Sequence, residues 1–227
     1  MGRRHRPREG GVVSESGLSA LQVELAQLFF SLPESRGFLL AGGGALIAQG
    51  YVDRPTDDLD FFTSRGSGSV DAASDALVAA VSARGWRAEL VRSGLEFRRW
   101  VITGPEVLVV DLAVDSPPVS RPTVTILGPS IPPSDLAVRK VLALFGRAEP
   151  RDFVDVYALN QHFDRDGTLS RAAESDKGFT LQAFAQSVRS HTRLDDDDFP
   201  DAGVSAGALR SYFDAWADEL ESGSTDD

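Results

Sequence analysis

The stretch LAGGGALIAQGYVDRPTDDLDFF, residues 40–62, places a run of glycines shortly before two aspartates. Side chains alternate across a β-strand, so Asp58 and Asp60 share one face while Leu59 points into the core. Two adjacent carboxylates repel each other unless a cation neutralises them, and hard oxygen ligands favour Mg²⁺ over a transition metal. The pair therefore predicts a strand that binds metal and nucleotide. An Asp-x-Asp pair on a solvated turn is the alternative, which the flanking apolar residues disfavour.

The glycines predict a turn that binds anions. Gly42 and Gly43 admit a phosphate close to backbone N–H groups, and Gly44 begins a short helix whose N-terminus attracts anions. The turn does not fit a dinucleotide-binding fingerprint, because Ile47 stands where the third glycine is required. It does not fit a P-loop either, because no Gly-Lys-Ser/Thr follows. A plain helix entry is the alternative for these glycines.

A third carboxylate lies in a later apolar segment, VLVVDLA, residues 107–113. Asp111 is the lone acid of this predicted strand, and burying an unpaired charge costs on the order of several kcal/mol. We therefore expect a cation beside Asp111. An aspartate at a strand end, capped by backbone N–H groups, is the alternative. Asp115 is interpreted as a turn residue before Pro117 and Pro118.

The segment after residue 133 is helical in pattern and carries a second group of charges. Ser134 is a plausible N-cap. Lys140 lies among apolar neighbours, so its stem either reaches past them to solvent or its ammonium points into a cleft. Asp152 and Asp155, three residues apart, share a helix face and could orient Lys140 or Arg147 by ion pairing. Acids near a helix N-terminus are favourable in any case.

Apolar spacing and turn residues outline the other elements. The predicted helices and strands, in chain order, are helix 18–32, strand 38–41, the short helix from Gly44, strand 59–63, helix 70–84, strands 86–91, 95–103 and 107–114, and helices 179–189 and 204–221. A proline-rich connection, residues 116–133, separates the strands from the later helices. Residues 1–16 are basic and glycine-rich and are predicted to be disordered.

Composition limits the classes of protein. The 227 residues are 42% hydrophobic and contain no cysteine, which excludes disulfides and thiolate metal sites. No apolar run approaches the length of a membrane span, and residues 1–11 lack the apolar core of a signal peptide, so we expect a cytoplasmic protein without a membrane partner. The three histidines, His5, His162 and His191, are scattered and are interpreted as surface or cap residues.

The net charge of −11 is unfavourable for an enzyme that acts on nucleic acid. The acids are concentrated in residues 195–198 and after Asp214, whereas the middle of the chain is rich in arginine. A local basic face could bind one RNA end. Solvated arginines on strand edges are the alternative.

The order of these motifs resembles that of a known family. Gly42 and Gly43 followed by Arg54-x-Thr56-x-Asp58-x-Asp60 is similar to the first motif of the DNA polymerase β-type nucleotidyltransferases, specifically the AbiEii/MenT-type toxins. Residues 134–159 are similar to that family's Asp-Leu, Lys, Arg and Arg-Asp-x-x-Asp segment. The resemblance covers most of residues 36–160. One departure is Gly44, where relatives often carry Ser or Thr.

The resemblance implies an α+β fold: a polymerase β-like core with a mixed sheet flanked by helices, and a C-terminal helical annex. The expected division is a disordered basic segment at 1–16, the nucleotidyltransferase core at 17–130, and a helical domain that completes the active site at 131–227. The implied activity is Mg²⁺-dependent in-line transfer of NMP from NTP to an acceptor hydroxyl, with tRNA 3′ ends as the acceptor. The protein would be the toxin of a toxin–antitoxin or phage-defence pair, with a cognate antitoxin as partner.

The resemblance also assigns roles to residues. The metal ligands would be Asp58, Asp60 and Asp111, with Lys140 and Asp152 as further catalytic residues. The nucleotide-binding residues would be Gly42, Gly43, Arg54, Thr56, Arg147 and Arg151. In MenT-type relatives an antitoxin kinase can modify the position that matches Thr56, which makes Thr56 a candidate regulatory phosphorylation site. A threonine that only caps the turn after Pro55 is the alternative.

Two other functions are compatible with parts of the sequence. A glycosyltransferase could use Asp58-Leu-Asp60 to hold the metal of a sugar nucleotide, but it would not explain Lys140 or the Arg151-Asp152 segment. A noncatalytic nucleotide-binding protein could keep the fold to bind a partner, but it would have no reason to keep three aspartates together.

Overall fold

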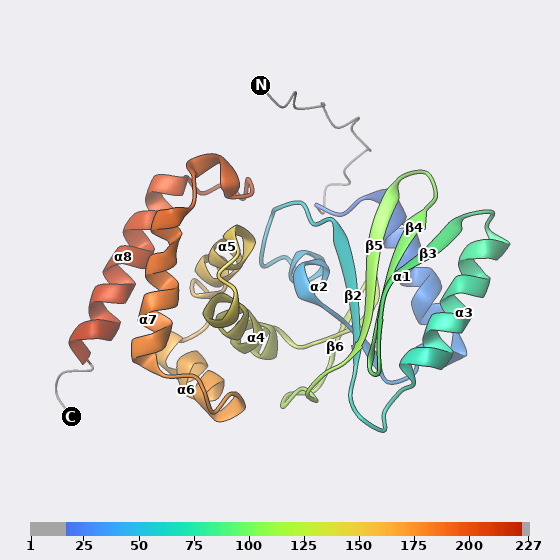
Figure 1. Ribbon diagram of the computed structural model, residues 1–227, viewed down its shortest axis with the longest axis horizontal. Coiled ribbons are helices and arrows are strands. Elements are labelled where there is room, and N and C mark those ends of the chain that lie inside the picture. The colour runs from blue at the N-terminus through green and yellow to red at the C-terminus, as the bar shows by residue number, and fades with distance from the viewer. Residues whose placement is uncertain (1–16, 224–227) are drawn as a thin grey trace.

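The computed structural model describes residues 17–223 as a mixed β-sheet with helices on both faces (Figure 1). The predicted disordered segment, residues 1–16, lies outside this range. The α+β class predicted from the sequence is confirmed. In this part of the chain no helix is long and apolar enough to cross a membrane.

The sheet has seven strands in the order β3-β4-β5-β2-β1-β7-β6. Strands β2 and β5 pair in parallel, as do β1 and β7, and the other neighbours are antiparallel. The bounds are β1 Phe38–Ala41, β2 Asp58–Thr63, β3 Arg87–Gly94, β4 Phe97–Thr103, β5 Val107–Val114, β6 Thr123–Thr125 and β7 Gly128–Ser130. The first five strands were predicted. The last two were not, because three-residue strands containing Gly and Pro look like a turn.

Helices α1 (Ala20–Ser31) and α3 (Val70–Ala83) lie on one face of the sheet, and α2 (Gly42–Ala48) lies on the other (Figure 1). Ser19 and Gln22 form a capping box at the start of α1. Beyond α2 lie the C-terminal helices: α4 Pro133–Gly146, α5 Pro150–Leu159, α6 Arg165–Ser175, α7 Leu181–Arg189 and α8 Ala206–Gly223. Helix α4 begins at Pro133 with Pro132 as its N-cap residue, so the predicted Ser134 cap is wrong; proline suits the first helical position.

Buried apolar side chains form two clusters. The first lies around the sheet, where the ring of Phe29 on α1 stacks on Phe61 of β2 with centroids 4.2 Å apart. The second lies among the C-terminal helices, where Phe153 and Phe213 meet edge to face. Helix α4 contributes to both clusters, so it joins the sheet to the helices behind it.

The histidine prediction is wrong at one position. His191 is 1% exposed, and its Nε2 lies 3.0 Å from an Asp214 carboxylate oxygen. His162 is exposed, as expected, and His5 lies outside the described residues. Asp214 is 23 positions away in sequence, so only the packing of α8 reveals the partner of His191.

Candidate active site

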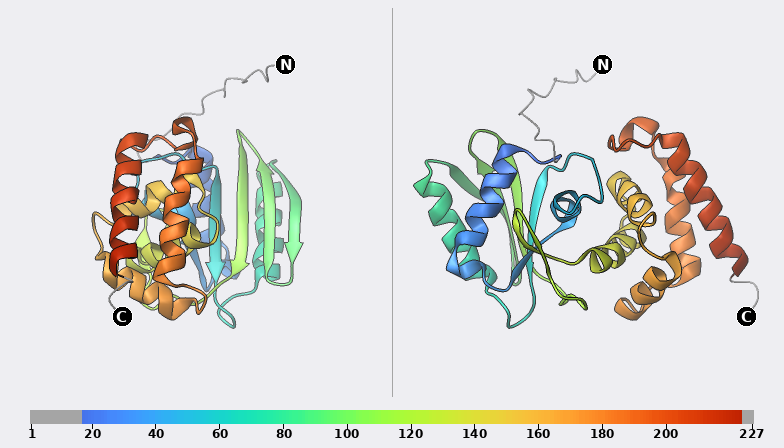
Figure 2. Two further views of the ribbon diagram at one scale, coloured as in Figure 1. Left: turned by 60° about the vertical axis from the view of Figure 1, so that its left-hand side comes forward. Right: turned by 180° about the vertical axis from the view of Figure 1, so that it is seen from behind.

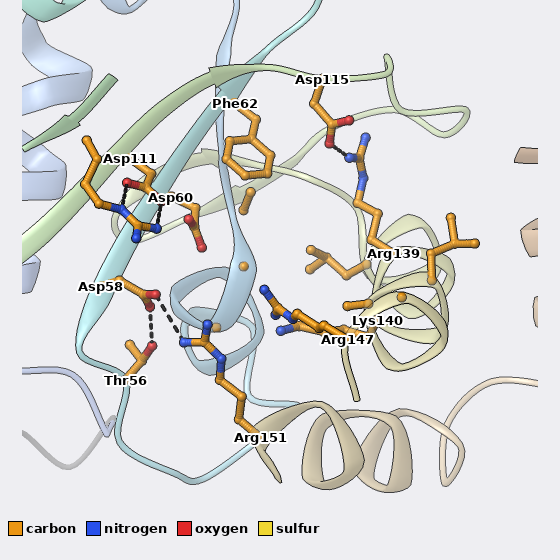
Figure 3. Close-up of a pocket in the computed structure, with 18 of the residues that line it drawn as sticks. Thr56, Asp58, Asp60, Phe62, Asp111, Asp115, Arg139, Lys140, Arg147 and Arg151 are labelled. Atoms are coloured by element: carbon orange, nitrogen blue, oxygen red, sulfur yellow. Dashed lines mark hydrogen bonds and ion pairs between the residues drawn. The ribbon is translucent and has the colours of Figure 1, made fainter. Parts of the chain in front are cut away.

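Strand β2 presents Asp58 and Asp60 on one face of the sheet. Its burial alternates: Leu59, Phe61 and Thr63 are buried, whereas the residues between them are half-buried. The strand placement predicted from the alternation is therefore confirmed. The outward face of β2 looks toward α2, α4 and α5 (Figure 3).

Asp111 lies beside Asp60 because β5 pairs in parallel with β2 in the register Asp60 to Asp111. Three aspartates therefore share one sheet face. The expected cation next to Asp111 is Arg99 of β4, whose Nε and Nη2 donate to the two carboxylate oxygens at 2.7 and 2.6 Å. The sequence reasoning missed Arg99. The short turn between β4 and β5 sets the register in which residue 99 faces residue 111. The length of this hairpin turn could therefore have predicted the pair Arg99–Asp111.

Asp58 has two partners, one on each side. The hydroxyl of Thr56 donates to one carboxylate oxygen at 2.8 Å, and Arg151 Nη1 donates to the other at 3.2 Å. Arg151 also pairs with Glu149 through its Nε at 3.0 Å. The start of α5 is thereby held against the start of β2.

Asp60 has a strongly perturbed ionisation. Burial raises its pKa to about 7, and repulsion from Asp58 and Asp111 acts in the same direction, while Lys140 and Arg151 oppose the shift. In the metal-free protein this carboxyl therefore exchanges its proton near neutral pH. A bound divalent cation would favour the ionised form.

The glycine turn crosses directly over Asp60. Gly42 has a φ of +61°, and a Cβ there would lie 1.7 Å from an Asp60 carboxylate oxygen. A Cβ on Gly43 would lie 2.8 Å from the Thr56 hydroxyl oxygen. Any larger residue at position 42 would be strained and would displace the carboxylate, so glycine is required for the approach of the backbone.

A chain of buried ion pairs lies behind these residues. Asp155 accepts two hydrogen bonds from Arg54, both at 2.7 Å, and lies 2.7 Å from Lys140 Nζ. Burial opposes ionisation of Asp155, but Lys140 and Arg54 outweigh it and hold its pKa below the ordinary value. Asp152 lies 3.8 Å from Lys140 Nζ and accepts two hydrogen bonds from Arg147. The predicted pairing of the two acids with Lys140 and Arg147 is confirmed.

These contacts settle how two predicted cations lie. Lys140 is 7% exposed and lines the cavity, so its stem does not carry the ammonium to open solvent. Arg54 also lines the cavity, but its side chain is 2% exposed and its guanidinium donates to Asp155 and to the Pro55 carbonyl.

A cavity of about 510 Å³ lies between the aspartates and the cations of α4, and Arg151 of α5 contacts Asp58 beside it (Figure 3). This volume is in the range of small-molecule sites. Its charged lining residues are Arg54, Asp58, Asp60, Arg99, Asp111, Asp115, Arg139, Lys140, Arg147 and Arg151. Arg139 pairs with Asp115, a contact that the sequence did not indicate. One wall is thus rich in acid and the opposite wall is rich in cations.

The aspartates fit a hard divalent cation in donor type. As the side chains stand, no group of three or more Asp, Glu or His residues within 17–223 is arranged to hold a metal ion. The reason is visible in the contacts: Arg99 holds Asp111 and Arg151 holds Asp58. The two guanidinium groups neutralise the carboxylates that a metal ion would otherwise neutralise.

Residues 25–226 match the family model described as "Nucleotidyl transferase AbiEii toxin, Type IV TA system". The chain belongs to this family. It is therefore a nucleotidyltransferase, and its place in a toxin–antitoxin family confirms the resemblance seen in the motifs. None of the curated proteins matches this AbiEii-family chain in sequence.

Two solved structures share the fold of this AbiEii-family protein. JHP933 from Helicobacter pylori is 18% identical, with a TM-score of 0.54 over 91% of this chain and 96% of that chain. MenT4, the nucleotidyltransferase toxin Rv2826c from Mycobacterium tuberculosis H37Rv, is 14% identical, with a TM-score of 0.57 over 88% of this chain and 89% of that chain. At such identities the likeness shows the fold.

Proposed function

We propose that this protein is a cytoplasmic toxin that transfers NMP from an NTP to the 3′ hydroxyl of an RNA, with tRNA 3′ ends as the acceptor. One observation carries the proposal: a single cavity places three aspartates opposite a group of cations. Nucleotidyl transfer needs that arrangement, because the triphosphate is a polyanion and its attacker must lose a proton.

Mg²⁺ is the cofactor that suits the donor set. Asp58, Asp60 and Asp111 would hold it through carboxylate oxygens, which hard cations prefer. When bound, the ion would neutralise phosphate charge and raise the nucleophilicity of the acceptor hydroxyl. Because Arg99 and Arg151 now hold two of these carboxylates, both arginines would have to share them.

Each residue of the site would have its own role in the transfer reaction. Asp111 accepts the proton of the acceptor hydroxyl as its oxygen bonds to the α-phosphorus. The bond from the α-phosphorus to the bridging oxygen breaks, and pyrophosphate leaves in line. Lys140, Arg147 and Arg151 offset the charge of the triphosphate, and the backbone at Gly42 and Gly43 binds its oxygens.

Lys140 and Arg147 would have to be held in position to bind the triphosphate. Asp155 and Asp152 hold Lys140 and Arg147 in place, so their positive charges are fixed before the nucleotide arrives. Arg54 acts through Asp155, since its own guanidinium is occupied. Preorganised charge of this kind stabilises a transition state without the cost of reorganisation.

Regulation by an antitoxin would act at Thr56. Its hydroxyl donates to Asp58 at 2.8 Å, which supports a role in the site over a role only in capping the turn after Pro55. A phosphoryl group there would add about two negative charges beside the aspartates and compete with the triphosphate. A cognate antitoxin that phosphorylates Thr56 would therefore silence the enzyme.

The test is to incubate the purified protein with Mg²⁺, total tRNA and each α-labelled NTP in turn. We expect label to appear on tRNA with at least one NTP, and none with Asp58→Ala. A sugar-labelled nucleotide donor run in parallel checks the glycosyltransferase alternative. Transfer of sugar label without nucleotide label, or no transfer at all, would refute the proposal.

A further inference from the structure

We propose that the face of β3 and β4 opposite α3 binds the single-stranded 3′ end of the RNA acceptor, through Arg92 and Phe97. This inference rests on the proposed function, and it adds the surface and the chemical class of the ligand. It places the acceptor on the side of the aspartates opposite the cations of α4 and α5.

The surface is a continuation of the active-site face of the sheet. Helix α3 packs on the other face of these strands (Figure 2). On that face the indole of Trp100 donates to Ser74 at 2.9 Å. Phe97 and Arg99 alternate with Trp100 and so point away from α3, toward the side that carries Asp111. Arg92 is exposed and Phe97 is half-buried, so both are accessible to a ligand.

Among residues 17–223, Arg92 lacks the carboxylate partner that the neighbouring arginines Arg98 and Arg99 have. It lies directly opposite Arg99 across the two strands, an unfavourable pairing of like charges. Asp111 neutralises Arg99, whereas in the described part of the chain no carboxylate pairs with Arg92. The guanidinium groups of Arg92 and Arg99 both lie over the Phe97 ring, at 5.6 and 5.9 Å from its centroid.

The acids of this hairpin already have partners. Glu89 pairs with Arg87, and Glu96 pairs with Arg65. Neither acid therefore neutralises Arg92. Because Arg99 is already paired with Asp111, Arg92 is the guanidinium left to bind an anion from outside the chain.

A cation beside an accessible aromatic ring suits single-stranded nucleic acid. A phosphate would bind the guanidinium, and a base would stack on Phe97 or on the guanidinium plane. The chain as a whole carries a net charge of −11, so a polyanion needs a local cationic site to approach it. The site leads to Asp111, the residue proposed to accept the proton of the acceptor hydroxyl.

The test measures RNA binding and NTP binding separately on the full chain. A fluorescein-labelled single-stranded RNA of about 12 nucleotides is titrated by anisotropy at several salt concentrations. We expect Arg92→Gln to weaken binding and to reduce the salt slope by about one. We expect the double variant Arg92→Gln/Phe97→Leu to weaken binding about tenfold or more, through the added loss of stacking.

Arg84→Gln is the matched control. Arg84 also lies over an aromatic ring, at 5.9 Å from Trp86, but on the α3 side and with Glu24 as its partner. We expect this variant to bind RNA as the wild type does. All variants should bind a fluorescent NTP analogue with unchanged affinity, which shows that the cavity is intact.

The outcomes separate the two proposals. RNA binding that is absent in the wild type, or equal in the wild type and the double variant, would overturn the RNA assignment and leave this face to a protein partner. NTP binding that is absent in the wild type would refute the proposed function instead, whatever the RNA result.

Discussion

Replacement of Asp155 by asparagine tests whether the buried ion pairs hold the sheet and the C-terminal helices together. Asp155 on α5 is fully buried, and its partners are Arg54, before β2, and Lys140, on α4. Asparagine keeps the size of the side chain but leaves two buried cations facing a neutral amide. Removing one partner of a buried pair costs about 3–5 kcal/mol of unfolding free energy. For a chain of this size about 4 kcal/mol lowers the Tm by roughly 8–16 °C.

The assay is thermal unfolding followed by circular dichroism at pH 7.5, with a urea titration for the free energy. Glu96→Gln is the control, because its ion pair with Arg65 is exposed and should be worth less than about 0.5 kcal/mol. The pKa of Asp155 is lowered in the folded state, so ionised Asp155 adds to the free energy of unfolding. This stabilisation is fully present above the unfolded-state pKa and is lost as the pH falls through the folded-state pKa. A Tm of Asp155→Asn within about 1 °C of wild type at pH 7.5 would refute this reasoning.

Three further predictions concern the cavity itself. Asp60→Asn should raise the Tm of the EDTA-treated protein at pH 8 and raise it much less at pH 4.5, because a pKa raised from 3.8 to about 7 costs the folded state at most about 4 kcal/mol once the carboxyl ionises. Calorimetry should also show loss of Mg²⁺ binding, and an unchanged Tm at both pH values would contradict the raised pKa of Asp60. Lys140→Met should reduce kcat at least about 100-fold, and it should also lower the free energy of unfolding because Asp155 loses a partner. NMP transfer at nearly the parental rate would show that Lys140 has only a structural role. Thr56→Glu should abolish transfer and growth inhibition while Thr56→Val keeps part of both, since only glutamate places a charge beside Asp58; transfer by the glutamate variant at the parental rate would rule out control at this residue.

Local patterns in the sequence were sufficient for five strands of the sheet, including the strand that carries Asp58 and Asp60. The alternation around Leu59 placed Asp58 and Asp60 on one face because the side-chain period of a strand is two. The glycines predicted a tight turn, and the φ of +61° at Gly42 agrees with it; the binding of phosphate at this turn stays a prediction. These features depend on residues a few positions apart, so short-range geometry determines them.

Other features depended on pairing between distant segments. Arg54 and Asp155 are 101 positions apart, and nothing near either residue in the sequence shows that they form an ion pair. The sequence suggested Arg54 as a ligand for phosphate. In the structure α5 packs against the loop before β2, and the guanidinium of Arg54 pairs with Asp155 instead. In the same way, the partner of His191 depends on where α8 packs.

The sequence by itself predicted which residues form the candidate site: three aspartates, a glycine turn and a group of cations in a recognisable order. Only the tertiary structure decided how their charges are balanced. Arg99 neutralises Asp111, Arg151 neutralises Asp58, and Arg92 is left over a phenylalanine ring without a carboxylate partner within residues 17–223. The physical reason is that Coulomb interactions depend on distance and burial in the folded chain, and these are set by strand register and helix packing rather than by sequence neighbours.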